Sequence, residues 1–200
     1  MSPAVPVVHV DGLQLVRRTI ERYVPLSDAA WEMVAPCWHE RTFGKGSFIS
    51  EVDRVEQWFS IVLAGVQRLY VEHEGATHCL GFSYPHSWTG DYASFVTQGP
   101  GRFQVEAVSD TVLWSIAHVD LHHLYDQVPA MDRFGRLILE EIVQGRATRE
   151  IELLTLPAEA RFRRFMQRSP HLLQLVAQKD IASYLHMTPE TFSRLRARVR

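Results

Sequence analysis

Residues 179–200 read KDIASYLHMTPETFSRLRARVR, and this stretch decides what the end of the chain builds. Its first half predicts a short helix, because Ile181, Ala182 and Leu185 recur at helical spacing. The helix is expected to break at His186. The pattern therefore predicts a short helix followed by a tight turn.

A second helix is predicted to begin at Thr188. The threonine hydroxyl can cap exposed backbone amides, and Pro189 suits the first helical position, where a missing N–H has no cost. Phe192, Leu195 and Val199 then recur every three or four residues and predict a buried stripe. Two short helices joined by a tight turn are typical of a helix-turn-helix.

The opposite face of this second helix carries residue types that read DNA. Arginine can donate two hydrogen bonds to guanine, a carboxylate can accept one from cytosine, and hydroxyls suit phosphates. We therefore expect duplex DNA as a partner, bound through Thr188, Pro189, Glu190, Thr191, Ser193, Arg194, Arg196 and Arg198. Arg194 and Glu190 are expected to discriminate bases, and Arg161, Arg164 and Arg198 to contact phosphates of any sequence. A basic helix that only packs on the body is the alternative left open.

The charge distribution favours the DNA-binding interpretation. Residues 155–200 hold nine Lys and Arg against three Asp and Glu, a balance of +6. The first 154 residues hold twelve against twenty, a balance of −8, so the net charge of −2 hides the asymmetry. A basic segment on an acidic body suits phosphate neutralisation. Binding to a membrane surface is disfavoured, because the basic helix lacks a broad Trp, Phe and Leu face.

Length and composition argue against a membrane protein, a secreted protein and a protein with a cysteine-held metal centre. A chain of 200 residues with 46% hydrophobic content can bury a real core. No run of eighteen apolar residues predicts a membrane span, and residues 1–14 do not resemble a secretory signal, so a cytoplasmic location is expected. Cys37 and Cys79 are too few for a cysteine-held iron–sulfur cluster or a zinc ribbon.

The hydrophobic period changes twice along the chain. Residues 13–39 predict two helices, the second capped by Ser27. Residues 41–116 alternate short apolar runs with polar turns and predict an antiparallel β-barrel or roll. After Pro129 a helical period lasts about twenty-five residues and predicts a helix on the order of 35 Å long. Its apolar stripe is best buried by a second copy of the chain.

These features together resemble the cyclic AMP receptor and fumarate-nitrate-reduction (CRP/FNR) regulator family of bacterial transcription factors. The marks are FGKG at 43–46, IVLAGV at 61–66 and TPETFSR at 188–194. The family's recognition helix follows its capping residue with Arg-Glu-Thr, an apolar residue, a small residue and Arg. Glu190, Thr191 and Arg194 match this pattern, and Pro189 replaces the first arginine.

The resemblance implies an α+β protein with three parts. They are an effector-type β-roll domain with N-terminal helices at 1–128, a dimerisation helix at 129–154, and a helix-turn-helix domain at 155–200. It also implies a homodimer on a pseudo-palindrome with half-sites about 34 Å apart, and leaves RNA polymerase open as a partner. Typical members add a β-hairpin wing, whereas this sequence ends at Arg200. We therefore expect the affinity to depend more on Arg196, Arg198 and Arg200.

The effector pocket that the resemblance implies departs from the family pattern. Its residues here are Gly90, Asp91, Tyr92, Ser94 and Arg102. A cyclic-nucleotide binder has Glu after the glycine and, about nine residues on, an arginine followed by Ser or Thr and Ala. Here the carboxylate is Asp91, and Arg102 lies eleven residues further on. Cyclic AMP bound in the usual way is therefore disfavoured, and another small molecule or none stays open.

Two further interpretations involve different chemistry. His118, His122 and His123 include a pair of imidazoles four residues apart, a spacing that metals use. Without the Glu of the peptidase pattern we expect surface histidines. A metal-dependent cupin enzyme is disfavoured because the His-x-His with a downstream Glu is missing. We expect no catalytic and no metal-binding residues, and a stand-alone small-molecule sensor acting through protein contacts remains the alternative to a regulator.

Overall fold

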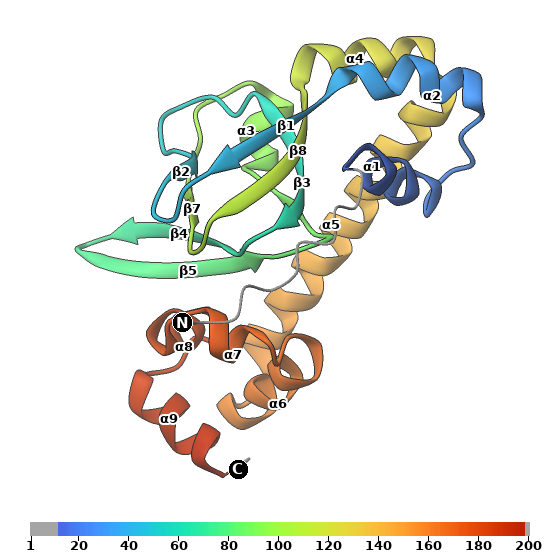
Figure 1. Cartoon of the computed structure of the whole chain (residues 1–200). Coiled ribbons are helices and arrows are strands. Elements are labelled where there is room, and N and C mark those ends of the chain that lie inside the picture. The colour runs from blue at the N-terminus through green and yellow to red at the C-terminus, as the bar shows by residue number, and fades with distance from the viewer. Residues whose placement is uncertain (1–11, 199–200) are drawn as a thin grey trace, which may run out of the picture.

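The computed structural model describes residues 12–198, which form a roll of two sheets, a long helix and a C-terminal group of helices (Figure 1). The strands are β1 Trp38–Phe43, β2 Phe48–Ser50, β3 Trp58–Ala64, β4 Gln67–His73, β5 Ala76–Ser83, β6 Trp88–Thr89, β7 Gln104–Ala107 and β8 Thr111–Ala117. The helices are α1 Gly12–Glu21, α2 Asp28–Val34 with a 3₁₀ turn at Ala35–Cys37, α3 Tyr92–Thr97, α4 His118–Gln127, α5 Pro129–Thr155, α6 Ala158–Arg168, α7 Leu172–Leu175, α8 Gln178–Tyr184 and α9 Pro189–Ala197.

The roll consists of two four-stranded antiparallel sheets. One has the order β1-β8-β3-β6 and the other β2-β7-β4-β5. Gly65 makes the turn between β3 and β4, with a φ of +92°, and an added Cβ would lie 2.5 Å from the carbonyl oxygen of Asp110. Only glycine fits both the backbone angle and the space. The glycine of the IVLAGV stretch at 61–66, between two strands, is therefore a physical requirement of this turn.

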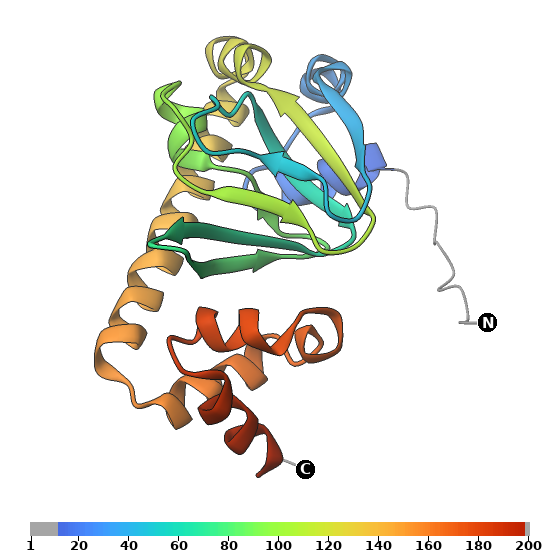
Figure 2. The same cartoon turned by 90° about the vertical axis from the view of Figure 1, so that its left-hand side faces the viewer.

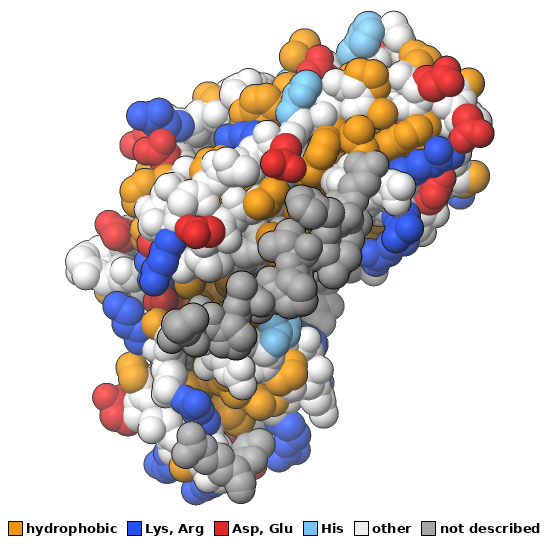
Figure 3. Space-filling model, in the orientation of Figure 1, with side chains coloured by type: hydrophobic (Ala, Val, Ile, Leu, Met, Phe, Trp, Pro, Cys, Tyr) orange, Lys and Arg blue, Asp and Glu red, His pale blue; other side chains and the backbone are white. Residues whose placement is uncertain are grey.

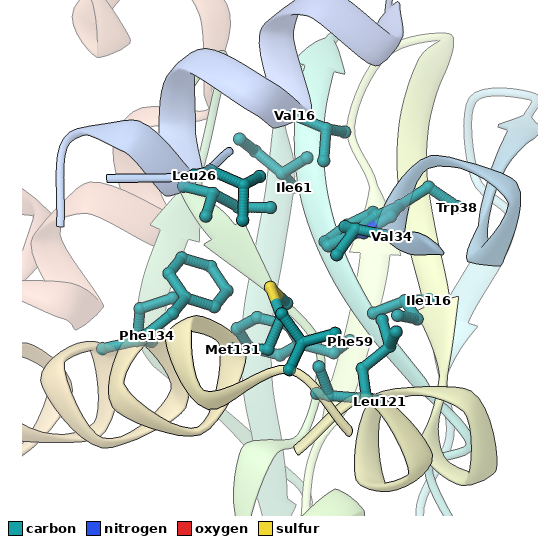
Figure 4. Packing of buried hydrophobic residues seen from close by; sticks show 14 of the residues in the cluster. Val16, Leu26, Val34, Trp38, Phe59, Ile61, Ile116, Leu121, Met131 and Phe134 are labelled. Atoms are coloured by element: carbon teal, nitrogen blue, oxygen red, sulfur yellow. The ribbon is translucent and has the colours of Figure 1, made fainter. Parts of the chain in front are cut away.

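The main core lies between the β1-β8-β3-β6 sheet and the helices that cover it. Figure 4 shows Phe59 of β3 and Ile116 of β8 facing Leu121 of α4 and Met131 and Phe134 of α5. These side chains are at most 5% exposed. Full burial of such side chains stabilises by about 1.5–3 kcal/mol each. The start of α5 is therefore anchored to the roll.

The rest of α5 leaves the roll and carries the chain to its last helices. The sequence predicts about twenty-five helical residues after Pro129, and the helix has 27, about 40 Å of helix. The prediction is confirmed. It could be made from the sequence because the Pro in the first turn and the sustained helical period are local signals.

Helices α6 to α9, residues 158–198, form a second small core and are called the C-terminal module below. Phe162, Phe165, Ile181, Phe192 and Leu195 are buried together in it. The module lies beneath the β4–β5 hairpin, with α8 against the hairpin and α9 at the far side (Figures 1 and 2). The module is thus docked on the roll that precedes it.

One detail differs from the sequence expectation. The predicted N-terminal helical stretch, 13–39, ends earlier: α2 stops at Val34, and the chain enters β1 at Trp38. Trp38 pairs with Ile116 of β8 and is 3% exposed, so sheet pairing and burial override the helical period there. Among the described residues, no helix is both long enough and apolar enough to cross a membrane.

Candidate functional site

The junction of α8 and α9 has the geometry that its sequence predicts. His186 adopts a left-handed backbone with a φ of +50°, which ends the first helix. The Thr188 hydroxyl accepts a hydrogen bond from the Thr191 amide at 3.2 Å and caps α9, and Pro189 occupies the first turn. Both signals act within four residues, so the sequence alone was sufficient to place this helix start.

The inner face of α9 packs into the module as predicted. Phe192 is fully buried and Leu195 is 6% exposed. The Phe192 ring meets Phe162 of α6 edge to face, with 5.6 Å between ring centroids. The third member of the predicted stripe, Val199, lies outside the described residues. This packing fixes which face of α9 points outward.

The outer face of α9 leaves its arginines unpaired. Of the eight candidate DNA-binding residues, Thr191 and Arg196 are half-buried, and the exposed ones are Thr188, Pro189, Glu190, Ser193, Arg194 and Arg198. Arg194, Arg196 and Arg198 make no ion pair with another described residue. Basic side chains gather around this end of the molecule in Figure 3. The face can therefore accept phosphates or base edges without breaking internal contacts.

Glu190 is the one acidic residue on that face. Its pKa lies below the usual range, because its own backbone amide and the Thr188 hydroxyl donate hydrogen bonds to the carboxylate. The carboxylate is therefore ionised at neutral pH and remains an acceptor.

Two arginines that the sequence assigned to phosphates have internal roles. Arg161 donates to the carbonyl oxygens of Leu185 at 2.8 Å, Leu156 at 2.5 Å and His186 at 2.9 Å. These bonds join the end of α5 to the end of α8. Arg164 donates to Glu152 of α5 at 2.6 Å. The sequence could not reveal this, because the partners lie 5 to 25 residues away in loops and helix ends.

Two of the five candidate effector residues, Asp91 and Ser94, already use their side-chain polar groups in hydrogen bonds within the fold. Asp91 is 1% exposed and accepts from the backbone amides of Ser94 at 3.2 Å and Arg102 at 2.9 Å. Ser94 accepts from the Glu56 amide at 2.9 Å and donates to the Gly99 carbonyl at 2.6 Å. Asp91 and Ser94 therefore close the turn and cap α3, instead of facing a ligand.

The three remaining candidates point in different directions. Gly90 takes a φ of +119°, and Tyr92 is half-buried with its pKa raised by burial. The Arg102 side chain is exposed and lines a separate depression with Gly99 and Gly101. The structure thus brings Gly90 and Tyr92 to a shared pocket and leaves Arg102 outside it.

That shared pocket lies between the roll and α5 and is aromatic. Its cavity volume is about 120 Å³, and it is lined by Trp58, Phe59, Leu69, Trp88, Thr89, Gly90, Tyr92, Phe95, Ile142 and Arg146. Phe59 and Trp88 stack inside it with 4.5 Å between centroids. Apart from Gly90 and Tyr92, sequence reasoning missed the residues that line this pocket. The aromatic enrichment was visible, but nothing in its spacing showed that β3, β4, β6, α3 and α5 converge.

The histidines are dispersed. His118 and His122 stack one turn apart on α4, with 4.1 Å between ring centroids, and His123 is exposed. Burial and the neighbouring His122 lower the pKa of His118. Across residues 12–198 no group of three or more His, Cys, Asp and Glu side chains could hold a metal ion.

We compared the chain with known protein families and structures. Residues 40–128 match the family model of the cyclic nucleotide-binding domain. No curated protein matches the chain in sequence.

Solved structures resemble nearly the whole chain. FixK2 from Bradyrhizobium japonicum is 20% identical, with a TM-score of 0.68 over 81% of this chain and 84% of its own. The Catabolite Activator Protein of Thermus thermophilus is 22% identical, with a TM-score of 0.55 over 87% and 84%. A CooA mutant from Carboxydothermus hydrogenoformans is 16% identical, with a TM-score of 0.64 over 82% and 77%. The resemblance to CRP/FNR regulators is thereby confirmed at the level of fold.

Proposed function

We propose that this chain, which carries a cyclic nucleotide-binding domain and shares the fold of CRP/FNR regulators, is a dimeric transcription regulator that binds duplex DNA through α9. In this proposal residues 1–128 are the sensor part, 129–154 the dimerisation helix and 155–200 the helix-turn-helix part. The protein acts in transcription without catalysing a reaction.

The observation that carries the proposal is the outer face of α9. Thr188 caps the helix, Phe192 anchors its inner face, and Arg194 is exposed with no ion-pair partner among the described residues. An arginine held on a rigid helix can donate two hydrogen bonds to a guanine in the major groove. The basic balance of this segment adds sequence-independent affinity for phosphates.

Dimerisation is supported by an apolar stripe on α5. Leu139, Val143, Ile151 and Leu154 are 41, 55, 61 and 79% exposed. With Ala147 between them they recur every three or four residues and so share one face of the helix. A continuous exposed apolar stripe on a long helix is best buried by the same stripe of a second copy. Two copies would present two recognition helices to one pseudo-palindrome.

The sensor part is proposed not to bind cyclic AMP in the usual way. Asp91 is 1% exposed and accepts from two backbone amides, so ribose hydroxyls could reach its carboxylate only if the turn opened. Arg102 is not among the residues that line the pocket between the roll and α5, so no arginine from the turn is there to meet a cyclic phosphate. An effector of any other class would act by favouring one orientation of the two DNA-binding parts over another.

The experiment that tests the proposal is selection of bound duplexes from a random-sequence pool at near-physiological salt, without ligand and with cyclic AMP. We expect an enriched two-fold site with half-sites about one helical turn apart in both arms. Arg194→Ala should weaken binding to that site by about 5- to 150-fold, the range of one base contact worth about 1–3 kcal/mol. Arg133→Ala, an exposed arginine at the far end of α5, is the matched control and should bind as the parent does.

Absence of an enriched site in both arms, or full binding by Arg194→Ala, would remove α9 as the DNA reader. Enrichment only with cyclic AMP would keep the regulator and overturn the proposal on its effector.

A further inference from the structure

A second cavity lies where the roll, α5 and the C-terminal module meet. It has a volume of about 100 Å³. Its wall comes from the end of β5, the last turns of α5, and α6 and α8. It is separate from the aromatic pocket described above, with which it shares no lining residue. We propose that this junction cavity binds a small aromatic carboxylate.

The apolar part of the wall suits a flat hydrocarbon. Phe82 of β5 and Phe165 of α6 line it, and both lie near the Tyr184 ring of α8, with centroids 5.5 and 6.2 Å away. Leu172 and Leu185 complete this side and are 2% and 5% exposed. A buried apolar cavity of roughly 150 Å³ accepts benzene. The junction cavity, which also opens to solvent, is on that scale and suits one aromatic ring.

The polar part of the wall has an excess of positive charge. Arg149, Arg161 and Arg168 line the cavity together with one carboxylate, Glu152, which leaves a balance of three positive charges to one negative, or +2. Glu152 accepts hydrogen bonds from Arg168 and from Arg164, which lies outside the cavity wall, so it does not neutralise the other two arginines. A low-dielectric site with unneutralised cations favours an anion.

Arg149 is the residue best placed to hold that anion. Its guanidinium lies 4.2 Å from the centre of the Tyr184 ring and donates to the Tyr184 carbonyl at 3.0 Å, which fixes its position. Its Nε is buried and has no hydrogen-bond partner among the described residues. A buried unmet donor costs about 1–3 kcal/mol. A guanidinium that lines the cavity and is held in one plane against an aromatic ring is suited to a carboxylate.

Two hydroxyls at the cavity can assist. The Tyr84 and Ser169 hydroxyls are 3.0 Å apart, and either oxygen can be the donor. The pair can therefore turn one O–H toward a carboxylate while keeping its own bond. An occupant would touch the roll, α5 and the C-terminal module at once. Because this site exists only when the module is docked, binding would shift the equilibrium toward the docked arrangement.

Calorimetric titration of the full chain tests the proposal directly, with benzoate, its neutral analogue benzamide, and inorganic phosphate as the three probes. We expect saturable binding of one benzoate per chain, with benzamide and phosphate at least tenfold weaker. Arg149→Met should weaken benzoate binding at least tenfold, and Arg133→Met, remote on the same helix, should not change it. Since no DNA is present, the outcome does not depend on the proposed regulator function.

A second variant separates lost binding from lost folding. Leu153→Phe fills the cavity from the α5 side without removing a charge, and it should abolish benzoate binding while the circular dichroism of the chain is unchanged. Equal affinity for benzoate and benzamide would overturn the role of the arginines. Tighter binding of phosphate than of benzoate would overturn the aromatic class, and absence of benzoate binding to the parent chain would overturn the site.

Discussion

Arg68 of β4 and Asp180 of α8 form an ion pair across the junction of the roll and the C-terminal module, with 2.8 Å between Nη1 and Oδ1. The same guanidinium binds Glu106 of β7 at 2.7 Å. Burial lowers the pKa of Arg68, but the hydrogen bonds to Glu106 and Asp180 outweigh it, and the pKa is raised overall. The module is therefore held on the roll by a charge that stays ionised at all ordinary pH values.

Arg68→Met is expected to loosen this docking. Asp180 is 8% exposed and would lose its only ion-pair partner among the described residues, at a cost of about 1–3 kcal/mol. The free energy of unfolding in urea should fall by that amount, and the radius of gyration from X-ray scattering should rise. Arg54→Met removes an exposed pair with Glu51 and should change either quantity little. Equal effects of the two variants would show that the junction pair does not hold the module.

Glu152→Gln is expected to destabilise the chain in a pH-dependent way. The hydrogen bond from Arg168, followed by that from Arg164, holds the pKa of Glu152 below its usual 4.5, even though burial opposes this. A lowered pKa contributes stability that is present above pH 4.5 and is lost as the pH falls through the lowered value. The variant should cost about 1 kcal/mol at pH 7, because solvent screens the half-exposed arginines.

Urea unfolding at pH 7 and at pH 3 checks this dependence. The difference between the parent and Glu152→Gln should shrink at the lower pH, because pH 3 lies below the usual pKa of 4.5 and the stability that a lowered pKa contributes is lost as the pH falls. Glu150→Gln, an exposed neighbour on α5, should match the parent at both pH values. A difference that stays constant with pH would contradict the assignment of the lowered pKa.

Thr188→Ala is expected to weaken the start of α9. Loss of the hydroxyl that accepts from the Thr191 amide should lower the free energy of unfolding by about 1 kcal/mol. Thr188→Ser keeps the hydroxyl and should retain most of the stability, as measured by urea denaturation of the full chain. An alanine variant as stable as the serine variant would mean that the hydroxyl does not cap the helix.

The two thiols are expected to differ in reactivity. Burial raises the pKa of Cys79 to about 12, so only about one molecule in 10⁴ carries the thiolate at pH 8. Cys37 is half-buried, and its pKa is raised less far. Iodoacetamide at pH 8 should label Cys37 first and Cys79 only in denaturant, as read by peptide mass spectrometry. Rapid labelling of Cys79 in the folded chain would contradict its burial.

Val143→Glu is expected to weaken the proposed dimer. A charge in the middle of the apolar stripe of α5 must be buried or solvated at the interface, and we expect the dimer dissociation constant to rise at least tenfold. Gly145→Glu adds the same charge on the opposite side of α5, where an added side chain meets open space, and is the control. Sedimentation equilibrium measures both. Equal dissociation constants would exclude this face as the dimer contact.

Structural features that depend only on residues close together in the sequence could be predicted. The cap of α9 by Thr188 and the start of α5 at Pro129 were confirmed, since each depends on a few adjacent residues. The buried positions of Phe192 and Leu195 followed from their helical period. Gly65 was identified within its strand-glycine-strand pattern, and the close approach of Asp110 explains why it must be glycine.

Side-chain roles that depend on distant partners could not be predicted. Asp91 is a candidate effector residue, and the structure shows that it also caps α3 and holds the Arg102 amide. Arg161 was assigned to phosphates, but three backbone carbonyls occupy it. In both cases the residue type suited two tasks, and only the positions of the acceptors and donors around it decided between them.

The sequence by itself determined the order of the main parts, the basic character of the last segment and the outward face of α9, because these depend on local hydrogen bonding, periodicity and composition. The tertiary structure alone decided where the C-terminal module docks and which cavities form. Arg68 and Asp180 are 112 residues apart in the sequence, and Arg149 hydrogen-bonds to the carbonyl of Tyr184, 35 residues away. Such contacts arise from packing of separate elements, and a pattern along the chain does not encode which separate elements will meet.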